Sequence, residues 1–117
     1  MEPSARTLRV ALWVAAILAS AVFAIAGIGK LDKAMIGRFE EWGYTPGLAI
    51  AIGLLELLGA VGLLIPRCSA WAALGLIVIM FGALGTHLLA GEYLAALAPT
   101  LMLGLLGLVL FGRATAG

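Results

Sequence analysis

Charged side chains are scarce in this sequence. Only 11% of the 117 residues are Asp, Glu, Lys or Arg, whereas 64% are hydrophobic. So few polar groups cannot cover the surface of a water-soluble globule. The formal net charge of +1 also excludes the strongly basic surface of a nucleic-acid-binding protein. The composition therefore places the chain in a lipid bilayer and predicts no nucleic-acid partner.

Cysteine and histidine are each represented by a single residue, Cys68 and His87. One thiol can form neither an internal disulfide nor a CxxC redox pair. One imidazole, without cysteines or carboxylates at ligand spacing, falls short of the three or four ligands of a zinc site. The sequence also contains no ligand set for a haem or an iron–sulfur cluster. We therefore predict neither a metal site nor a covalently bound cofactor.

Long apolar runs are what the sequence has in abundance. Three uncharged runs cover Val10–Gly29, Ser69–Leu89 and Tyr93–Gly112, and a fourth, Leu48–Ile65, contains one charged residue, Glu56. Each run is close to the roughly 20 helical residues that cross a hydrocarbon core of about 30 Å. In lipid, a helix satisfies its own backbone hydrogen bonds, whereas barrel strands would show alternating patterns of about ten residues. We predict an all-α, integral membrane four-helix bundle, a single domain over residues 1–117, with spans at approximately 8–29, 48–65, 69–89 and 93–112.

The first run also has features of a secretion signal. Arg6 and Arg9 precede it, and Ala24-Ile-Ala26 near its end resembles a small-residue cleavage site. Its apolar stretch, however, is longer than the roughly 7–15 residues of a signal core. We therefore expect this run to be retained as a membrane helix.

The basic residues divide between the two ends of four antiparallel helices. One end would carry Arg6, Arg9, Arg67 and Arg113, and the other Lys30, Lys33 and Arg38. The charges that flank the first helix usually dominate the orientation. We therefore predict that both termini are cytoplasmic, in an inner or plasma membrane of bacterial type.

The connection between the first two spans, Lys30–Gly47, is the only long one. Its apolar residues recur at steps of three and four, which predicts a short helix lying at the membrane interface. Trp42 and Tyr44 would anchor this segment at the level of the lipid headgroups. The other connections, Ile65–Ser69 and Ala90–Tyr93, are short, so the last three spanning helices are expected to be consecutive antiparallel neighbours.

Glycine is frequent, with 16 residues in the chain. Helices associate in lipid where small residues let their backbones approach each other. We expect this packing role for the helix faces that carry Gly59 and Gly62, Gly104 and Gly107, and Gly82.

Glu56 needs a specific explanation, because a charge at the centre of a membrane helix costs about 2.5–3.5 kcal/mol on insertion scales. Such a residue usually faces the bundle interior and has a partner. By depth, Lys30 lies at the mouth of the outer half, and His87 with its neighbour Thr86 lies about one turn inside. Glu56 lies about 12 Å below the same boundary. If the helix rotations aim these four side chains at one another, they form a site that can bind and release protons.

Simpler roles exist for the same residues. A Glu56–Lys30 pair can be purely structural and fix the register of two helices. His87 can serve only as a hydrogen-bonding group at the interface, and Lys30 can simply extend its ammonium to the headgroups.

Four short patterns occur in order along nearly the whole chain. They are Ala26-Gly-Ile-Gly-Lys-Leu31, Phe39-Glu-Glu-Trp-Gly-Tyr44, Gly53-Leu-Leu-Glu-Leu-Leu-Gly-Ala60 with Gly62-Leu-Leu-Ile-Pro-Arg67, and Gly82-Ala-Leu-Gly-Thr-His87. Together they resemble the DoxX-like membrane proteins. The resemblance implies a four-helix membrane protein of the type first described as a small subunit of quinone-linked thiosulfate oxidation. It also implies links to thiol redox balance, oxidative stress and the assembly of other membrane proteins.

In this resemblance, Lys30, Glu56 and His87 occupy the polar motif positions, without a catalytic role to carry onto them. A family constrains the fold far more than the function. Whether the chain is an enzyme therefore stays open at this point.

Three functions remain. The first is a quinone-associated subunit that holds a quinone near Lys30, Glu56, Thr86 and His87 while a redox partner supplies electrons. The second is a scaffold or assembly subunit whose glycine-rich faces bind another membrane protein or a second copy. The third is a small proton-coupled transporter. The small multidrug resistance proteins are similar in length and have one membrane Glu, but theirs lies in the first helix, where this chain has no carboxylate.

Overall fold

A computed structural model describes residues 4–115 of the chain. These residues form five helices, which are α1 (Ala5–Gly29), α2 (Lys33–Glu41), α3 (Pro46–Leu63), α4 (Pro66–Leu89) and α5 (Leu97–Thr115). Four of the helices, all except α2, are long and apolar enough to cross a membrane. No strand occurs within this described range. The predicted all-α membrane bundle is thereby confirmed, and the chain is an integral membrane protein.

Proline and a capping serine set several helix boundaries. Pro46 and Pro66 begin α3 and α4, where the missing N–H of proline costs no intrahelical hydrogen bond. The side chain of Ser4 accepts a hydrogen bond from the backbone N–H of Thr7 at 3.1 Å and so caps the start of α1. These boundaries follow from local residue preferences alone.

The last spanning helix lies further along the chain than the apolar run predicts. It begins at Leu97 and not at Tyr93, and it continues to Thr115. Pro99 accounts for the later start, because a helix from Tyr93 would place this proline in its interior, where the ring clashes with the preceding turn. With the start at Leu97, Pro99 falls in the first turn, where its missing N–H is harmless.

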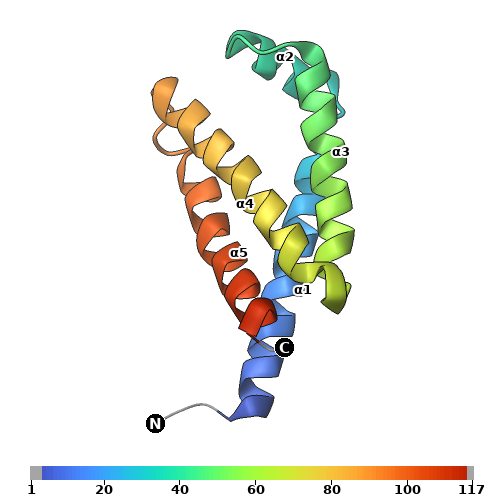
Figure 1. Ribbon diagram of the computed structural model, residues 1–117. Helices are drawn as coiled ribbons and strands as arrows, with labels where there is room; N and C mark the ends of the chain where they lie inside the picture. Colours follow the sequence, from blue (N-terminus) through green and yellow to red (C-terminus); the bar gives the residue numbers. More distant parts are fainter. Residues whose placement is uncertain (1–3, 116–117) are drawn as a thin grey trace.

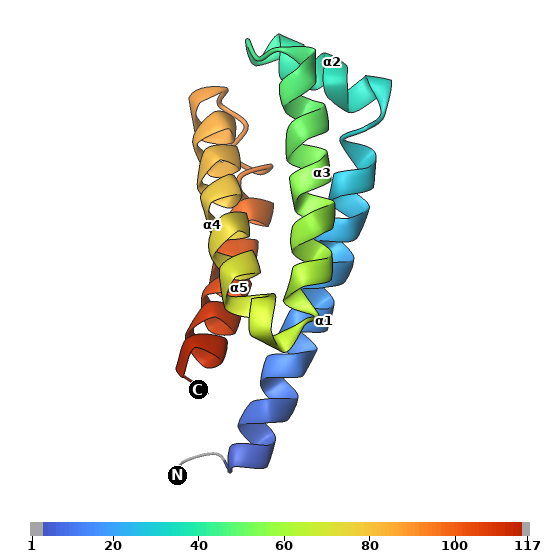
Figure 2. The ribbon, with the colours of Figure 1, turned by 45° about the vertical axis from the view of Figure 1, so that its right-hand side comes forward.

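The four spanning helices form a ring. Helix α1 packs against α3 and α5, and α4 packs against the same two helices, so α3, α4 and α5 are consecutive neighbours, as the short connections predict. Helix α1 begins and helix α5 ends at one end of the bundle (Figure 1). Helix α2 crosses the opposite end and packs against α3. Helices α3 and α4 join at the turn before Pro66 and separate toward α2 (Figures 1 and 2).

The interior of the ring contains small and aliphatic side chains with one aromatic ring, Phe23. A buried hydrogen bond joins α1 to α3, in which the hydroxyl of Ser20 donates to the carbonyl of Ala60 at 2.7 Å. Large apolar residues lie on the outside of the bundle, as in the case of Trp71, which is 76% exposed. Such a surface suits lipid, because lipid chains are as apolar as these side chains.

The expected glycine packing is confirmed for one helix pair and wrong for other positions. A Cβ added to Gly59 of α3 would lie 2.8 Å from the side chain of Leu76 of α4, so these helices approach closely there. In contrast, no atom of a neighbouring element lies within 4 Å of a Cβ added to Gly82, Gly104 or Gly107. These three positions turn away from helix contacts, because helix rotation is set by the whole packed interface and not by glycine content.

Candidate functional site

Helices α1 and α3 come into backbone contact where Gly27 faces Gly53. A Cβ added to Gly27 would lie 2.7 Å from the carbonyl oxygen of Gly53, and one added to Gly53 would lie 2.8 Å from that of Gly27. Any larger side chain would therefore push the two helices apart. Gly53 also leaves room for the stem of Lys30, whose Cβ is only 3.0 Å from the added Cβ position.

This crossing brings Lys30 and Glu56 together. Each Cα–Cβ bond of a helix tilts toward the N-terminus of that helix. Because α1 and α3 are antiparallel, Lys30 at the end of α1 tilts into the bundle and Glu56 of α3 tilts outward to meet it. The Lys30 Nζ atom lies 2.6 Å from Glu56 Oε1. The Glu56 side chain is 0% exposed and that of Lys30 is 18% exposed, so the carboxylate is fully enclosed behind the ammonium.

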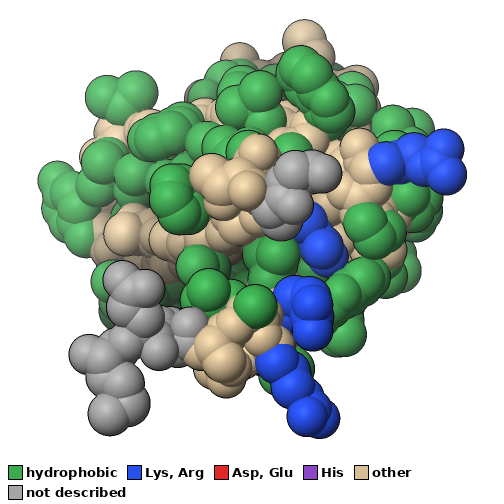
Figure 3. All heavy atoms as spheres, turned by 60° about the horizontal axis from the view of Figure 1, so that its bottom comes forward, with side chains coloured by type: hydrophobic (Ala, Val, Ile, Leu, Met, Phe, Trp, Pro, Cys, Tyr) green, Lys and Arg blue, Asp and Glu red, His purple; other side chains and the backbone are tan. Residues whose placement is uncertain are grey.

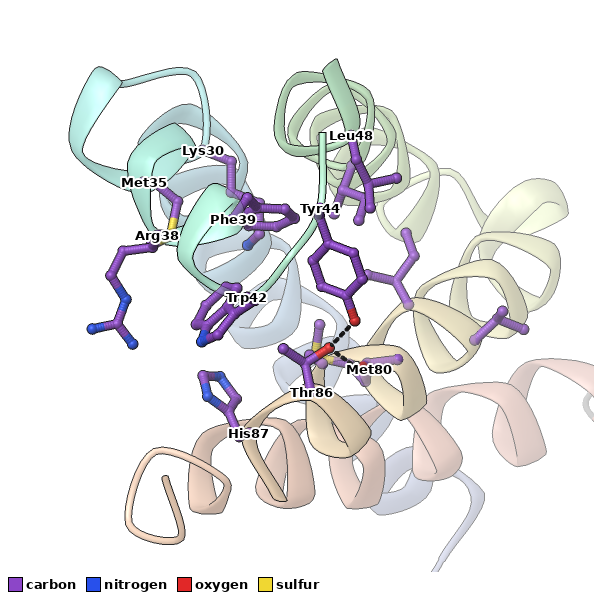
Figure 4. Close-up of a pocket in the computed structure, with 15 residues that line it drawn as sticks. Lys30, Met35, Arg38, Phe39, Trp42, Tyr44, Leu48, Met80, Thr86 and His87 are labelled. Atoms are coloured by element: carbon purple, nitrogen blue, oxygen red, sulfur yellow. Dashed lines mark hydrogen bonds between the residues drawn. The ribbon is translucent and has the colours of Figure 1, made fainter. Parts of the chain in front are cut away.

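Lys30 also lines a cavity of about 450 Å³ between α2, α3 and α4. Thr86 and His87 line the same cavity from α4, so three of the four predicted site residues share one space (Figure 4). Glu56 does not line it and reaches it only through Lys30. Among residues 4–115, no three His, Cys, Asp or Glu side chains lie close enough to hold a metal ion. The remaining walls are largely apolar and include Leu48, Ile52, Val78, Ile79 and Met80.

Glu92, which the sequence analysis missed, is the partner of His87. The Nδ1 atom of His87 lies 2.8 Å from Glu92 Oε1. The second carboxylate oxygen accepts a hydrogen bond from Arg38 Nη2 at 2.9 Å and one from Trp42 Nε1 at 3.4 Å. Arg38 and Trp42 belong to the α2 segment, so this one carboxylate links α2 to the end of α4. His87 is thus paired with the connection outside the span and not with Glu56.

The position of Glu92 depends on Gly91. Gly91 has a φ of +73°, a left-handed conformation that other residues rarely adopt. The chain closes α4 with a hydrogen bond from the Glu92 N–H to the His87 carbonyl at 2.8 Å and one from the Gly91 N–H to the Leu88 carbonyl at 3.2 Å. This pattern is a Schellman motif, which places the residue after the glycine against the last turn of the helix. It therefore sets Glu92 against His87.

The same motif ends α2. Gly43 has a φ of +92°, and the Tyr44 N–H donates to the Phe39 carbonyl at 2.8 Å. The ring of Tyr44 then lies 5.9 Å from that of Phe39, centroid to centroid. In the sequence, glycine is the fifth residue of both Phe39–Tyr44 and His87–Glu92. A glycine immediately after a helix is a readable signal for this turn, and it could have located Glu92.

Trp42 and Tyr44, predicted as headgroup anchors, line the cavity and contact α4 (Figure 4). The Tyr44 hydroxyl lies 2.7 Å from Thr86 Oγ1. Because the Thr86 hydroxyl donates its proton to the Gly82 carbonyl at 2.9 Å, Tyr44 is the donor in this bond. The Trp42 ring meets the His87 ring edge-on at 5.4 Å. These contacts hold α2 over the cavity.

The pKa of the Glu92 carboxyl is lowered from its ordinary value of 4.5, first by the hydrogen bond from His87. Desolvation opposes this effect, whereas Trp42 and Arg38 add to it. A carboxyl whose pKa is lower in the folded state contributes stability above its unfolded pKa and loses it as the pH falls through the folded pKa. The contact of α2 with the end of α4 should therefore hold at neutral pH and weaken in acid.

We expect acidification below pH 4.5, the ordinary pKa of the Glu92 carboxyl, to change the environment of Trp42. The measurement is the emission spectrum of Trp42 in a variant with Trp13 and Trp71 replaced by Phe. In the same background, Glu92→Gln should remove most of the pH dependence, because Gln does not titrate. An acid transition of equal size in the Gln variant would contradict the assignment to Glu92.

Comparison with known proteins identifies the family of the chain. The family model described as the DoxX-like family matches residues 14–110, a range that includes every residue of the site. Searches of curated proteins and of solved structures gave no match. The match covers most of the chain and confirms the resemblance seen in the four sequence patterns. The chain therefore belongs to the DoxX-like family of integral membrane proteins.

Proposed function

We propose that this protein is a quinone-associated membrane subunit that works with a redox partner. The cavity beneath α2 is the observation that carries the proposal. Its volume of about 450 Å³ lies within the roughly 300–1,000 Å³ of small-molecule sites. It also has the composition of such sites, because its walls are mostly apolar and a few polar groups converge at one end. We propose the quinone headgroup as its ligand.

Proton exchange is what a quinone requires, since it takes up protons together with electrons when it is reduced. Lys30 and His87 both line the cavity. The Lys30 ammonium can donate an N–H to a quinone carbonyl, whereas the neutral His87 ring, whose Nδ1–H donates to Glu92, presents Nε2 as an acceptor for a quinol hydroxyl. Behind Lys30 lies the carboxylate of Glu56, and behind His87 lies that of Glu92. Each of these two polar groups at the cavity therefore has a carboxylate next to it. In this proposal the redox partner supplies the electrons, and this chain supplies the binding site for the quinone.

We propose further that both termini are cytoplasmic and that the cavity lies in the outer half of the membrane. The end of the bundle where α1 begins shows several basic side chains, and no Asp, Glu or His side chain of the described residues comes into view there (Figure 3). Arg6 and Arg9 belong to the first turns of α1, and Arg67 to the first turn of α4. An excess of basic residues at one end supports a cytoplasmic location for that end.

Quenching of Trp42 fluorescence by a quinone tests the proposal directly. The protein, with Trp13 and Trp71 replaced by Phe, is placed in lipid nanodiscs and titrated with a ubiquinone that lacks the isoprenoid chain. Trp42 lines the cavity, so we expect quenching that saturates as the site fills. Quenching that rises linearly without saturation, as in random encounters within the lipid, would contradict the proposal and leave an assembly role.

A cavity-filling variant of the same protein sharpens this test. Gly82 lines the cavity and has free space at its Cβ position, so the side chain of Gly82→Leu should extend into the cavity and occupy part of it. Gly85→Leu is the matched control, because Gly85 lies on the same helix, also has free space and lines no cavity described here. We expect Gly82→Leu to weaken quinone binding by at least about tenfold and Gly85→Leu to leave it unchanged. Equal affinities in the two variants would place the quinone elsewhere.

A further inference from the structure

A second hollow lies next to the cavity, on the outside of the bundle. It is an open groove of about 690 Å³ between α3 and α4. Val78 and Ile79 line both the cavity and the groove, so the two spaces are adjacent at these side chains. From there the groove reaches Cys68 and Trp71 near the start of α4, and no charged side chain lines it. Charged groups therefore line the cavity and not the neighbouring groove.

We infer that the ligand of this site is an amphiphile with a long isoprenoid chain, whose head occupies the cavity and whose chain lies in the α3–α4 groove. This inference rests on the proposed function and narrows it to long-chain quinones. Cys68 precedes Ile79 by 11 residues, which corresponds to about 16 Å along α4. A headgroup alone does not extend over that length, whereas a flexible apolar chain does.

Close contacts between α3 and α4 form the floor of the groove, and a glycine leaves space above it. Gly59 of α3 lies against Leu76 of α4, and Gly62 lies against Ala72, so close helix contacts form the floor. Gly75 lines the groove, and no neighbouring atom lies within 4 Å of its Cβ position. A chain lying here would pack against the apolar side chains on the outside of α3 and α4.

The test compares two ubiquinones with the same head, one without an isoprenoid chain and one with a long chain. It uses the nanodiscs and the Trp42-only protein described above, in which Trp71→Phe keeps an apolar aromatic side chain in the groove. We expect the long-chain ligand to bind at least about tenfold more tightly. Gly75→Leu should remove this advantage, because the new side chain fills the groove, and should leave binding of the chain-free ligand unchanged. Gly85→Leu again serves as the control and should retain the advantage.

Cys68 provides a second, independent readout. It is the single cysteine of the sequence, it is exposed, and it lines the far end of the groove. The long-chain quinone should slow the reaction of Cys68 with a maleimide, whereas the chain-free quinone should not. In Gly75→Leu, the long-chain ligand should no longer protect the thiol.

The outcomes separate this inference from the proposed function. If the chain-free quinone binds and Gly75→Leu retains the full advantage of the long chain, the groove assignment is overturned and the proposed function stands. If neither quinone binds, both are overturned. Protection of Cys68 that depends on protein concentration and not on quinone would assign the groove to a second copy of the chain and would overturn the inference.

Discussion

Lys30→Met is expected to destabilise the bundle by about 3–5 kcal/mol, because it leaves the carboxylate of Glu56 buried without its partner. Glu56 is fully enclosed, and among the described residues no group other than Lys30 pairs with either of its oxygens. The carboxyl of Glu56 must then either remain charged in an apolar environment without a partner or take up a proton, and both are unfavourable. The measurement is unfolding in mild detergent by titration with a denaturing detergent, followed by circular dichroism.

The reverse change should be milder. In Glu56→Leu the ammonium of Lys30 remains 18% exposed at the mouth of the bundle and can extend to the headgroups. The double variant Lys30→Met/Glu56→Leu should return close to the stability of the original protein, because no charge stays buried. Equal losses in both single variants, with no recovery in the double variant, would contradict this account of the pair.

The double variant also separates the two roles of the pair. If it folds and still binds quinone in the Trp42 assay, Glu56 and Lys30 are structural. If it folds but loses quinone binding, Lys30 contributes a donor to the cavity, as proposed above. The ion pair alone does not decide between these roles, because a buried pair can fix helix register without taking part in chemistry.

Gly53→Ala is expected to produce the second large effect, a loss of about 1–3 kcal/mol, which is typical when extra atoms are forced into a packed interior. The new Cβ would lie 2.8 Å from the carbonyl oxygen of Gly27 and 3.0 Å from the Cβ of Lys30. Because a backbone carbonyl cannot move aside like a flexible side chain, α1 and α3 must separate. The separation should also lengthen the Lys30–Glu56 contact.

Gly29→Ala is the matched control for this prediction. Gly29 ends the same helix α1, and nothing lies within 4 Å of its Cβ position. We expect its melting temperature to be unchanged or slightly raised, since alanine favours a helix more than glycine does. Gly27→Ala should behave like Gly53→Ala, because each glycine faces the carbonyl of the other. Similar melting temperatures for Gly53→Ala and Gly29→Ala would exclude a tight crossing at this point.

Local signals in the sequence were sufficient to predict which segments form membrane-spanning helices. Hydropathy over about 20 residues identifies a membrane helix, since the bilayer itself sets that length. Pro46 and Pro66 likewise mark the starts of α3 and α4. The late start of α5 was missed only because Pro99 lies inside an apolar run that hydropathy reads as continuous. Gly43 and Gly91 also indicate the turns that end α2 and α4. From the turn at Gly91, the proximity of Glu92 to His87 could have been predicted.

The sequence by itself thus determined the fold class, the presence of four apolar spans, the short helix between the first two, and the positions of Lys30, Glu56 and His87 along the chain relative to these helices. Only the tertiary structure decided which of these side chains meet. Membrane helices are apolar on nearly every face, so the periodicity that marks the buried face of a soluble helix is weak here. Rotation is fixed by close contacts such as Gly27 with Gly53. For that physical reason the pairing of Glu56 with Lys30, and the cavity and groove between α3 and α4, became visible only in the packed molecule.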